Sequence, residues 1–207
     1  TALPSITFGA VTGTAVIPTI TFTTPHVASV AASSTNAVYD VSGIADLTDV
    51  KVTTAVNVNL KAAATTNVDV SGTTGAVEVD GGKNVVVTDA KNTVTLDNAK
   101  GNVTVTDATQ TAAITINDGA NVTVTATSAV DSGTINIGGT NGLNTGTATG
   151  DVVVTANLNS DGEADLDGGD VTVTGGKTVT VTTNSTIVST TADANAGDST
   201  LSVVALP

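Results

Sequence analysis

A nine-residue unit, written three times between Asn84 and Asp107, constrains the fold of this chain more than any other feature. Each unit has two aliphatic residues separated by one other residue, and it closes with Asp or Asn. Alternation with a period of two is typical of a β-strand with one buried face. Because Asn, Asp and Gly tolerate the backbone of tight turns, each unit predicts one short strand and one corner. The three aliphatic pairs are Val85/Val87, Val94/Leu96 and Val103/Val105.

Similar aliphatic pairs recur from residue 56 to the end of the chain. Successive pairs begin mostly about eight to twelve residues apart, a spacing typical of a β-solenoid, a sandwich or a barrel. Each pair predicts one further strand. The further pairs are Val56/Val58, Val68/Val70, Val77/Val79, Ile114/Ile116, Val122/Val124, Ile135/Ile137, Val152/Val154, Val171/Val173, Val179/Val181 and Leu201/Val203.

We expect an all-β fold and, within that class, a parallel β-solenoid in which two or three strands form one coil and coils stack at ~4.8 Å. The aliphatic pairs are nearly uniform in size, as residues stacked in columns require, and the turns vary in length, as solenoid corners do. The alternative is an antiparallel sandwich or meander. It stays open because residues 80–83 and 117–120 would also serve as hairpin turns.

The composition fits a narrow interior. The chain has no Cys, Met or Trp, and its aromatic residues are Phe8, Phe22 and Tyr39. A sandwich usually fills the space between its sheets with larger side chains, including aromatic ones. The lack of Cys excludes disulfides. Since no run of about 18 apolar residues occurs, the sequence predicts no membrane-spanning helix.

The charge of the chain excludes some classes of function. Its net charge is −13, and all six basic residues are Lys. A nucleic-acid-binding protein needs a basic surface, and an anionic membrane repels an acidic one. An acidic surface suits either simple solubility or an extracellular setting in which divalent cations screen it. Because the first residue is Thr rather than Met, we expect a processed form or a fragment.

Residues 1–39 differ from the rest because they contain no Asp, Glu, Lys or Arg. Two similar segments in them, residues 4–8 and 18–22, each predict a short strand that begins at Pro. We therefore divide the chain into an uncharged N-terminal arm, 1–39, and a β-repeat body, 40–207. The arm either caps the end of the body or crosses to a neighbouring copy and adds a strand there. The expected contact residues are Ile6, Phe8, Ile20 and Phe22.

Other segments interrupt the regular pattern. Residues 27–50 predict a connector with weak strands, in which Gly43 to Leu47 could form a helical turn. The repeat breaks again at residues 138–150 and 157–170. Long loops in a repeat body lie outside its core and often carry function.

The segments Gly133-Thr-Ile-Asn-Ile-Gly-Gly and Asn102-Val-Thr-Val-Thr-Asp resemble repeats of secreted bacterial β-solenoid surface proteins. The nearest are surface-layer (S-layer) proteins of the calcium-dependent Caulobacter type, and filamentous haemagglutinins and autotransporter adhesins are similar. The resemblance covers roughly residues 55–205 and is one of composition. It implies a secreted, cell-surface protein. The calcium nonapeptide of that family, Gly-Gly-x-Gly-x-Asp-x-Leu-x, is not intact in this chain.

An acidic segment within residues 157–170 is the candidate calcium site. Calcium binds six to eight oxygen ligands, which carboxylates and carbonyls on a turning backbone supply. The spacing from Asn157 to Asp165 matches the start of an EF-hand-like loop, but Gly168 stands where a bidentate Glu is expected. The other interpretation is a solvated acidic loop. The expected ligands are Asp161, Glu163, Asp165 and Asp167.

Outward-facing threonines are a second candidate surface. If the aliphatic pairs point inward, the Thr pairs between them point outward, and ice-binding solenoids present flat Thr-x-Thr arrays of a similar kind. Such a surface requires the pairs to lie in register on one side. The Thr pairs are Thr93/Thr95, Thr104/Thr106, Thr123/Thr125, Thr172/Thr174 and Thr180/Thr182. The expected interruptions are Asn84/Val86, Asp97, Asn117, Asn136 and Asp151/Val153.

Catalysis is not expected. His26 is the only histidine and Cys is absent, so zinc sites and catalytic triads lack their usual residues. Asp165 and Asp167 could pair for glycoside hydrolysis. Sugar-binding sites also use aromatic platforms and Arg or Lys, which are scarce here.

Together, these features predict an extracellular structural protein that assembles with copies of itself into a surface layer or a filament. The expected contacts are strand exchange by the arm and calcium bridging between acidic surfaces. The alternative is an adhesin or a stalk that binds glycans such as cell-surface polysaccharide, and ice binding is a third class. Neither a nucleic-acid partner nor membrane insertion is expected.

Overall fold

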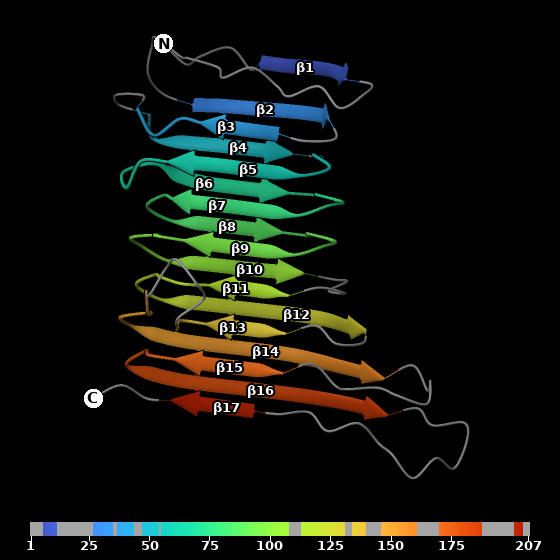
Figure 1. Cartoon of the computed structure of the whole chain (residues 1–207), viewed down its shortest axis with the longest axis vertical. Helices are drawn as coiled ribbons and strands as arrows, with labels where there is room; N and C mark the ends of the chain where they lie inside the picture. The colour runs from blue at the N-terminus through green and yellow to red at the C-terminus, as the bar shows by residue number, and fades with distance from the viewer. Residues whose placement is uncertain are drawn as a thin grey trace.

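The computed structural model describes residues 6–11, 27–34, 37–43, 47–53, 55–107, 113–130, 134–139, 146–160, 170–187 and 201–204. These residues form two sheets that run side by side along the long axis of the molecule (Figure 1). Sheet A has nine strands, in the order β1 (Ile6–Val11), β2 (Val27–Ser34), β4 (Asp49–Thr53), β6 (Asn67–Ser71), β8 (Val85–Thr88), β10 (Val103–Asp107), β12 (Val122–Val130), β14 (Asp151–Ser160) and β16 (Thr178–Ile187).

Sheet B has eight strands and lies against the inner face of sheet A. Its strands are β3 (Ala37–Asp40), β5 (Val58–Ala62), β7 (Val77–Gly81), β9 (Val94–Asp97), β11 (Ile114–Ile116), β13 (Ile135–Ile137), β15 (Val171–Thr174) and β17 (Leu201–Val204).

Consecutive strands from β2 to β17 alternate between the two sheets, so one coil consists of one strand from each sheet. Every strand pair in the described part of the chain is parallel. The predicted β-solenoid is therefore confirmed, with two strands per coil, and the antiparallel sandwich or meander is wrong. Each nine-residue unit of the sequence is half a coil.

The two segments that could have formed hairpins are corners between the sheets. Gly81 ends β7 and Gly82 follows it, with φ values of 94° and 97°, a left-handed backbone that favours glycine. A Cβ on Gly81 would lie 2.1 Å from the carbonyl oxygen of Ala62 in the preceding coil. The corner therefore depends on close backbone contact between coils, and it directs the chain into sheet A instead of back along sheet B.

The core is a set of straight columns of aliphatic side chains between the sheets. In sheet A the inward columns are Val50, Val68, Val85, Val103, Val122, Val152, Val179 and Val52, Val70, Val87, Val105, Val124, Val154, Val181. In sheet B they contain Val58, Val77, Val94, Ile114, Ile135, Val171 and Leu60, Val79, Leu96, Ile116, Ile137, Val173. Ten of the predicted pairs, from Val68/Val70 to Val171/Val173, are buried as expected.

Small residues close the ends of this narrow core. Ala90 and Ala99, at the corners on either side of β9, are buried, and so are Ala55 and Ala148 at other corners. Since alanine has a single side-chain carbon, the chain can turn there without leaving a gap or displacing the columns. This explains why a core of Val, Ile, Leu and Ala needs almost no aromatic residue.

One predicted pair is wrong in its register. Val56 is exposed, whereas Val58 and Leu60 are the inward pair of β5. Val56 lies in the turn before the strand, where the Asn57 side chain accepts a hydrogen bond of 2.8 Å from the backbone N–H of Ala76. The polar anchor at Asn57 therefore sets the start of the strand two residues later than the aliphatic pattern indicated.

The irregular segments also differ from expectation. Residues 27–50 do contain strands, β2, β3 and the start of β4, but these belong to the two stacked sheets and do not form a connector. The break expected at 157–170 begins later, since β14 continues to Ser160. Of the expected helical turn, residues 44–46 lie outside the described residues, and Leu47 is buried in non-helical backbone. The expected boundary between residues 39 and 40 falls inside β3, and the division into arm and body stays a prediction.

Tyr39 is the one aromatic residue in the described core, and its hydroxyl is buried without a hydrogen-bond partner among the described residues. Burial raises the pKa of Tyr39 to about 12. An ionised phenol at this position would lose its hydration with no compensating donor.

We predict that the core columns dominate stability, and Val87 and Val86 provide a matched test. Val87 is fully buried, whereas its neighbour Val86 is 37% exposed. Val87→Ala should lower the free energy of unfolding by about 2 kcal/mol, because methyl groups are lost and a cavity remains. Val86→Ala should change it by less than about 0.5 kcal/mol. Urea unfolding followed by circular dichroism measures both, and equal losses would contradict the columnar core.

We also predict that Tyr39 titrates late. Tyr39 is the only tyrosine and Trp is absent, so phenolate absorbance reports on this residue alone. The midpoint should lie near pH 12 in the folded protein and near pH ~10 in urea. Because the folded pKa is raised, the contribution of Tyr39 to stability is complete below pH ~10 and is lost as the pH rises towards 12. A native midpoint near that of the unfolded chain would show that the phenol is solvated.

Candidate functional site

The outward face of sheet A carries three straight columns of side chains. Parallel strands in constant register place the same strand position of every coil in one column. The first column, at the start of the strands, is polar and consists of Asp49, Asn67, Asn84, Asn102, Asn121, Asp151 and Thr178. The middle column is Lys51, Asp69, Val86, Thr104, Thr123, Val153 and Thr180. The last column is Thr53, Ser71, Thr88, Thr106, Thr125, Thr155 and Thr182.

The first column is an asparagine ladder. The side-chain amide of Asn67 donates to Oδ1 of Asp49 at 3.0 Å, and that of Asn84 donates to Oδ1 of Asn67 at 2.9 Å. Further along, the Asn121 amide donates to Oδ1 of Asn102 at 2.9 Å. Between these pairs, the backbone N–H of Asn102 donates to Oδ1 of Asn84 at 2.9 Å. The ladder therefore links each coil to the next at the point where the chain enters sheet A.

The ladder ends on a carboxylate at Asp49. Hydrogen bonds from the Thr48 hydroxyl and then from the Asn67 amide hold the pKa of Asp49 below its usual value. Both bonds favour the charged form, which can only accept hydrogen bonds. Asp49 thus supplies an acceptor for the amide of the next coil.

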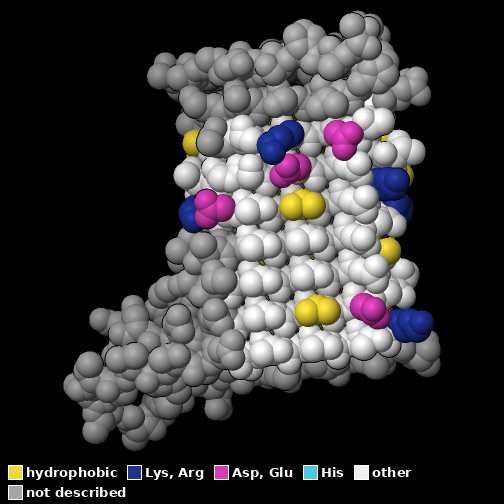
Figure 2. All heavy atoms as spheres, turned by 180° about the vertical axis from the view of Figure 1, so that it is seen from behind, with side chains coloured by type: hydrophobic (Ala, Val, Ile, Leu, Met, Phe, Trp, Pro, Cys, Tyr) yellow, Lys and Arg dark blue, Asp and Glu magenta, His cyan; other side chains and the backbone are white. Residues whose placement is uncertain are grey.

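The middle and last columns from β8 to β16 form the surface that we call the hydroxyl face. It consists of the pairs Val86/Thr88, Thr104/Thr106, Thr123/Thr125, Val153/Thr155 and Thr180/Thr182. All ten residues are exposed or partly exposed, and none is charged. The space-filling view shows this surface as a flat array of side chains in straight columns (Figure 2).

An ion pair bounds the hydroxyl face on the side of β4 and β6. The Nζ of Lys51 lies 3.1 Å from Oδ2 of Asp69, in the middle column of those two strands. Both side chains are about half exposed, so the pair contributes little to stability. Its effect is to end the uncharged surface at β8.

The structure sorts the predicted Thr pairs between the two sheets. Thr104/Thr106, Thr123/Thr125 and Thr180/Thr182 lie in register on sheet A, whereas Thr93/Thr95 and Thr172/Thr174 precede or lie on strands of sheet B. Of the interruptions expected on sheet A, Val86 and Val153 do replace Thr on the face, whereas Asn84 and Asp151 lie beside it. Asn84 and Asp151 belong to the ladder, and Val86 and Val153 pair with Thr88 and Thr155 on the face. If each of these pairs had been taken two residues later in the sequence, the pairs Val86/Thr88 and Val153/Thr155 would have been found.

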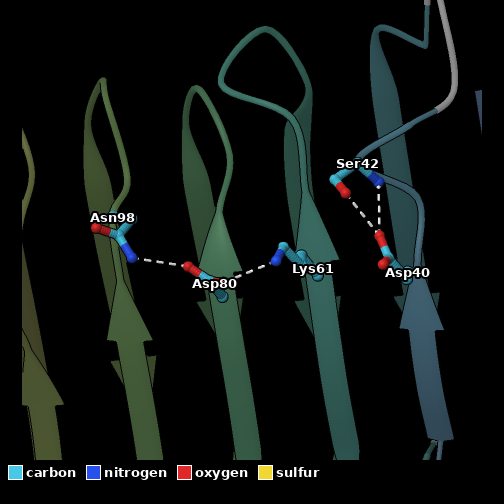
Figure 3. A network of polar contacts seen from close by, with 5 residues as sticks. All are labelled: Asp40, Ser42, Lys61, Asp80 and Asn98. Atoms are coloured by element: carbon cyan, nitrogen blue, oxygen red, sulfur yellow. Dashed lines mark hydrogen bonds and ion pairs between the residues drawn. The ribbon is translucent and has the colours of Figure 1, made fainter. Parts of the chain in front are cut away.

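The outward face of sheet B is charged and internally paired (Figure 3). Asp80 receives a hydrogen bond of 2.8 Å from the Asn98 amide on one side and lies 3.8 Å from Nζ of Lys61 on the other. Asp40 accepts hydrogen bonds from the Ser42 hydroxyl, at 2.7 Å, and from the Ser42 backbone N–H, at 3.1 Å. These bonds lower the pKa of Asp40. Each of these carboxylates therefore already has a donor beside it.

The same holds for the neighbouring acidic residues on sheet B. The Asn117 amide donates to Oδ1 of Asp97 at 2.6 Å, and the Asn59 amide donates to Oε2 of Glu78 at 3.0 Å. Among the described residues, no group of three or more Asp, Glu, His or Cys side chains could hold a metal ion. Asp97 and Asn117, which had been expected to interrupt a Thr array, belong to this sheet and not to the hydroxyl face.

The predicted calcium ligands Asp161, Glu163, Asp165 and Asp167 lie outside the described residues, and so does His26. The calcium site and the expected absence of catalysis stay predictions. Of the expected assembly contacts, Ile6 and Phe8 lie in β1, which pairs with β2 of its own chain at Val30 and Ala32. Ile20 and Phe22 fall outside the described part. Assembly through these residues also stays a prediction.

No protein-family model, no curated protein and no solved structure matches this chain. In the part of the chain that the structure describes, no helix has the length and hydropathy needed to cross a membrane.

We predict that the asparagine ladder stabilises the stack, and Asn92 provides the control. Asn84→Ala removes both a donor to Asn67 and an acceptor for Asn102, and should lower the free energy of unfolding by about 1–2 kcal/mol. Asn92 is exposed and contacts only the adjacent Thr93 in the described hydrogen bonds, so Asn92→Ala should cost less than about 0.5 kcal/mol. Urea midpoints at constant m measure the difference. Equal changes in the two variants would show that the hydrogen bonds of the ladder add nothing to the stability of the folded chain.

Proposed function

We propose that this chain is an extracellular structural module that assembles end to end with copies of itself into a filament or a surface layer. The observation that carries the proposal is the incomplete burial at the last coil of sheet A. Val179 and Val181 are only partly buried, whereas Val152 and Val154, one coil earlier in the same columns, are fully buried. A further coil would complete the columns at this end.

The strand edges favour the same conclusion. Among the strands that the structure describes, β16 is the last of sheet A and β1 is the first, so each is an edge strand in this part of the chain. Such an edge is a template for another strand. Joining the β16 edge of one copy to the β1 edge of the next is a head-to-tail contact, which extends without closing and gives a fibre. The strands would stay parallel and the columns would continue.

Charge determines how easily such contacts form. A net charge of −13 makes copies repel one another. Divalent cations would reduce this repulsion, and calcium held by residues 161–167 would bridge neighbouring copies. In this proposal the arm contributes Ile6, Phe8, Ile20 and Phe22 to the contact, as an added strand on the neighbouring copy. The acidic composition and the resemblance to secreted surface proteins support the extracellular location.

A matched pair of variants on β16 tests end-to-end assembly. Val181 faces inward at the open end, whereas Thr180 faces outward on the same strand. In concentrated solution, with and without calcium, the unchanged chain should form rods much longer than one molecule. Val181→Lys should block their growth, because a charge would be buried between coils, and Thr180→Lys should leave it intact. Sedimentation velocity and negative-stain microscopy measure the length.

A chain that lacks residues 1–25 loses β1 and leaves β2 as the first strand of sheet A, so it tests whether the arm strand is needed for the contact. Loss of rods in this chain supports a contact through β1, and retention of rods shows that the β2 edge suffices without the arm. If the unchanged chain remains monomeric at every concentration, with or without calcium, self-assembly is wrong. The monomeric rod would then suit a stalk in an adhesin.

A further inference from the structure

The hydroxyl face is periodic in two directions. Its coils are spaced by about 4.8 Å, and its two columns, formed by positions i and i+2 of each strand, are about 6.6 Å apart. The register over the ten positions has no irregularity, since each middle-column residue pairs directly with the next. A partner with a matching two-dimensional repeat would therefore meet equivalent groups at every coil.

The side chains on this face are chemically uniform and stiff. Eight of the ten are Thr and two are Val, so every position presents at least one methyl group. β-Branched residues have restricted χ1 angles, and the sheet holds their Cβ atoms in place. Little conformational entropy would be lost when an ordered partner binds.

The absence of charge on the face selects the kind of partner. The chain carries a net charge of −13, yet none of the ten residues is ionisable, and the Lys51–Asp69 pair lies outside the face. A charged polymer would find no counter-charge there. Because the face also has no aromatic residue, it offers no platform on which sugar rings could stack. A neutral hydrogen-bonding lattice remains.

We propose that the hydroxyl face binds ice. The Thr hydroxyls would hydrogen-bond water at lattice positions, and the methyl groups between them would order the water in the gaps. Val86 and Val153 keep the methyl groups but lack the hydroxyl, so each leaves one hydrogen bond unmade. This property does not depend on self-assembly, because all ten residues belong to one chain.

Nanolitre osmometry on the full chain tests the proposal. The unchanged protein should show thermal hysteresis and produce faceted ice crystals. Thr123→Lys places a charge at the centre of the face, between Thr104 and Val153, and should remove most of the hysteresis. Thr95→Lys places the same charge on the outward side of sheet B and should leave the hysteresis unchanged. Val153→Thr should raise it, because the missing hydroxyl is restored.

Circular dichroism and urea midpoints confirm that the Lys variants are folded. Rounded crystals with no hysteresis in the unchanged protein would overturn the proposal, and so would equal losses in Thr123→Lys and Thr95→Lys. A pull-down on crystalline cellulose and chitin tests the alternative partner, a crystalline polysaccharide. Retention on these solids that depends on Thr123, without hysteresis, would make polysaccharide the occupant and ice the wrong one. The assembly-blocked Val181→Lys variant should keep its hysteresis, which separates this test from the filament test.

Discussion

The whole structure depends on constant register between parallel strands of successive coils. Backbone hydrogen bonds fix the distance between coils, and the register decides which side chains share a column. Once that register holds, a Val of one coil can only pack on the Val of the next, as Val85 does between Val68 and Val103. The asparagine ladder and the glycine corner at Gly81 both act on this constraint. The first ties adjacent coils where the chain enters sheet A, and the second allows close backbone contact between coils where the chain leaves sheet B.

The same constraint separates the two outer surfaces chemically. On sheet B, the carboxylates of Asp80 and Asp97 each accept a hydrogen bond from an amide of the next coil, and Asp80 also lies beside Lys61. On sheet A from β8 to β16, the Asn and Asp side chains lie in the ladder, and the two outward columns beyond it carry Thr and Val. One molecule thus presents a charged side and a neutral side. The neutral side is extended because neither Val86 nor Val153 breaks the register of its column.

Much of this fold could be predicted from the sequence because the signal was local. The aliphatic pairs predicted strand positions, and their uniform size favoured stacked coils, which the structure confirms. The error at Val56 arose because a polar anchor, Asn57, set the start of the strand, and hydrophobic pattern alone carries no information about that anchor. Residues 27–50 were predicted only as a connector with weak strands, because β2 has Ala and Ser where later strands of sheet A have Val and Thr. The hydroxyl face was divided in the sequence because its pairs were grouped with the preceding Asn or Asp, and only the pairing between coils shows the correct grouping.

Coil length varies widely while the columns stay intact. Val68 lies 17 residues before its partner Val85, whereas Ile135 lies 36 residues before its partner Val171. The extra residues fall between strands in the sequence, so they do not disturb the paired positions. A gene that encodes such a chain could therefore duplicate or delete whole coils in tandem, and each copied segment would meet the same neighbours above and below as its parent. Length would then evolve as a nearly independent trait, without the compensating changes that a globular core demands.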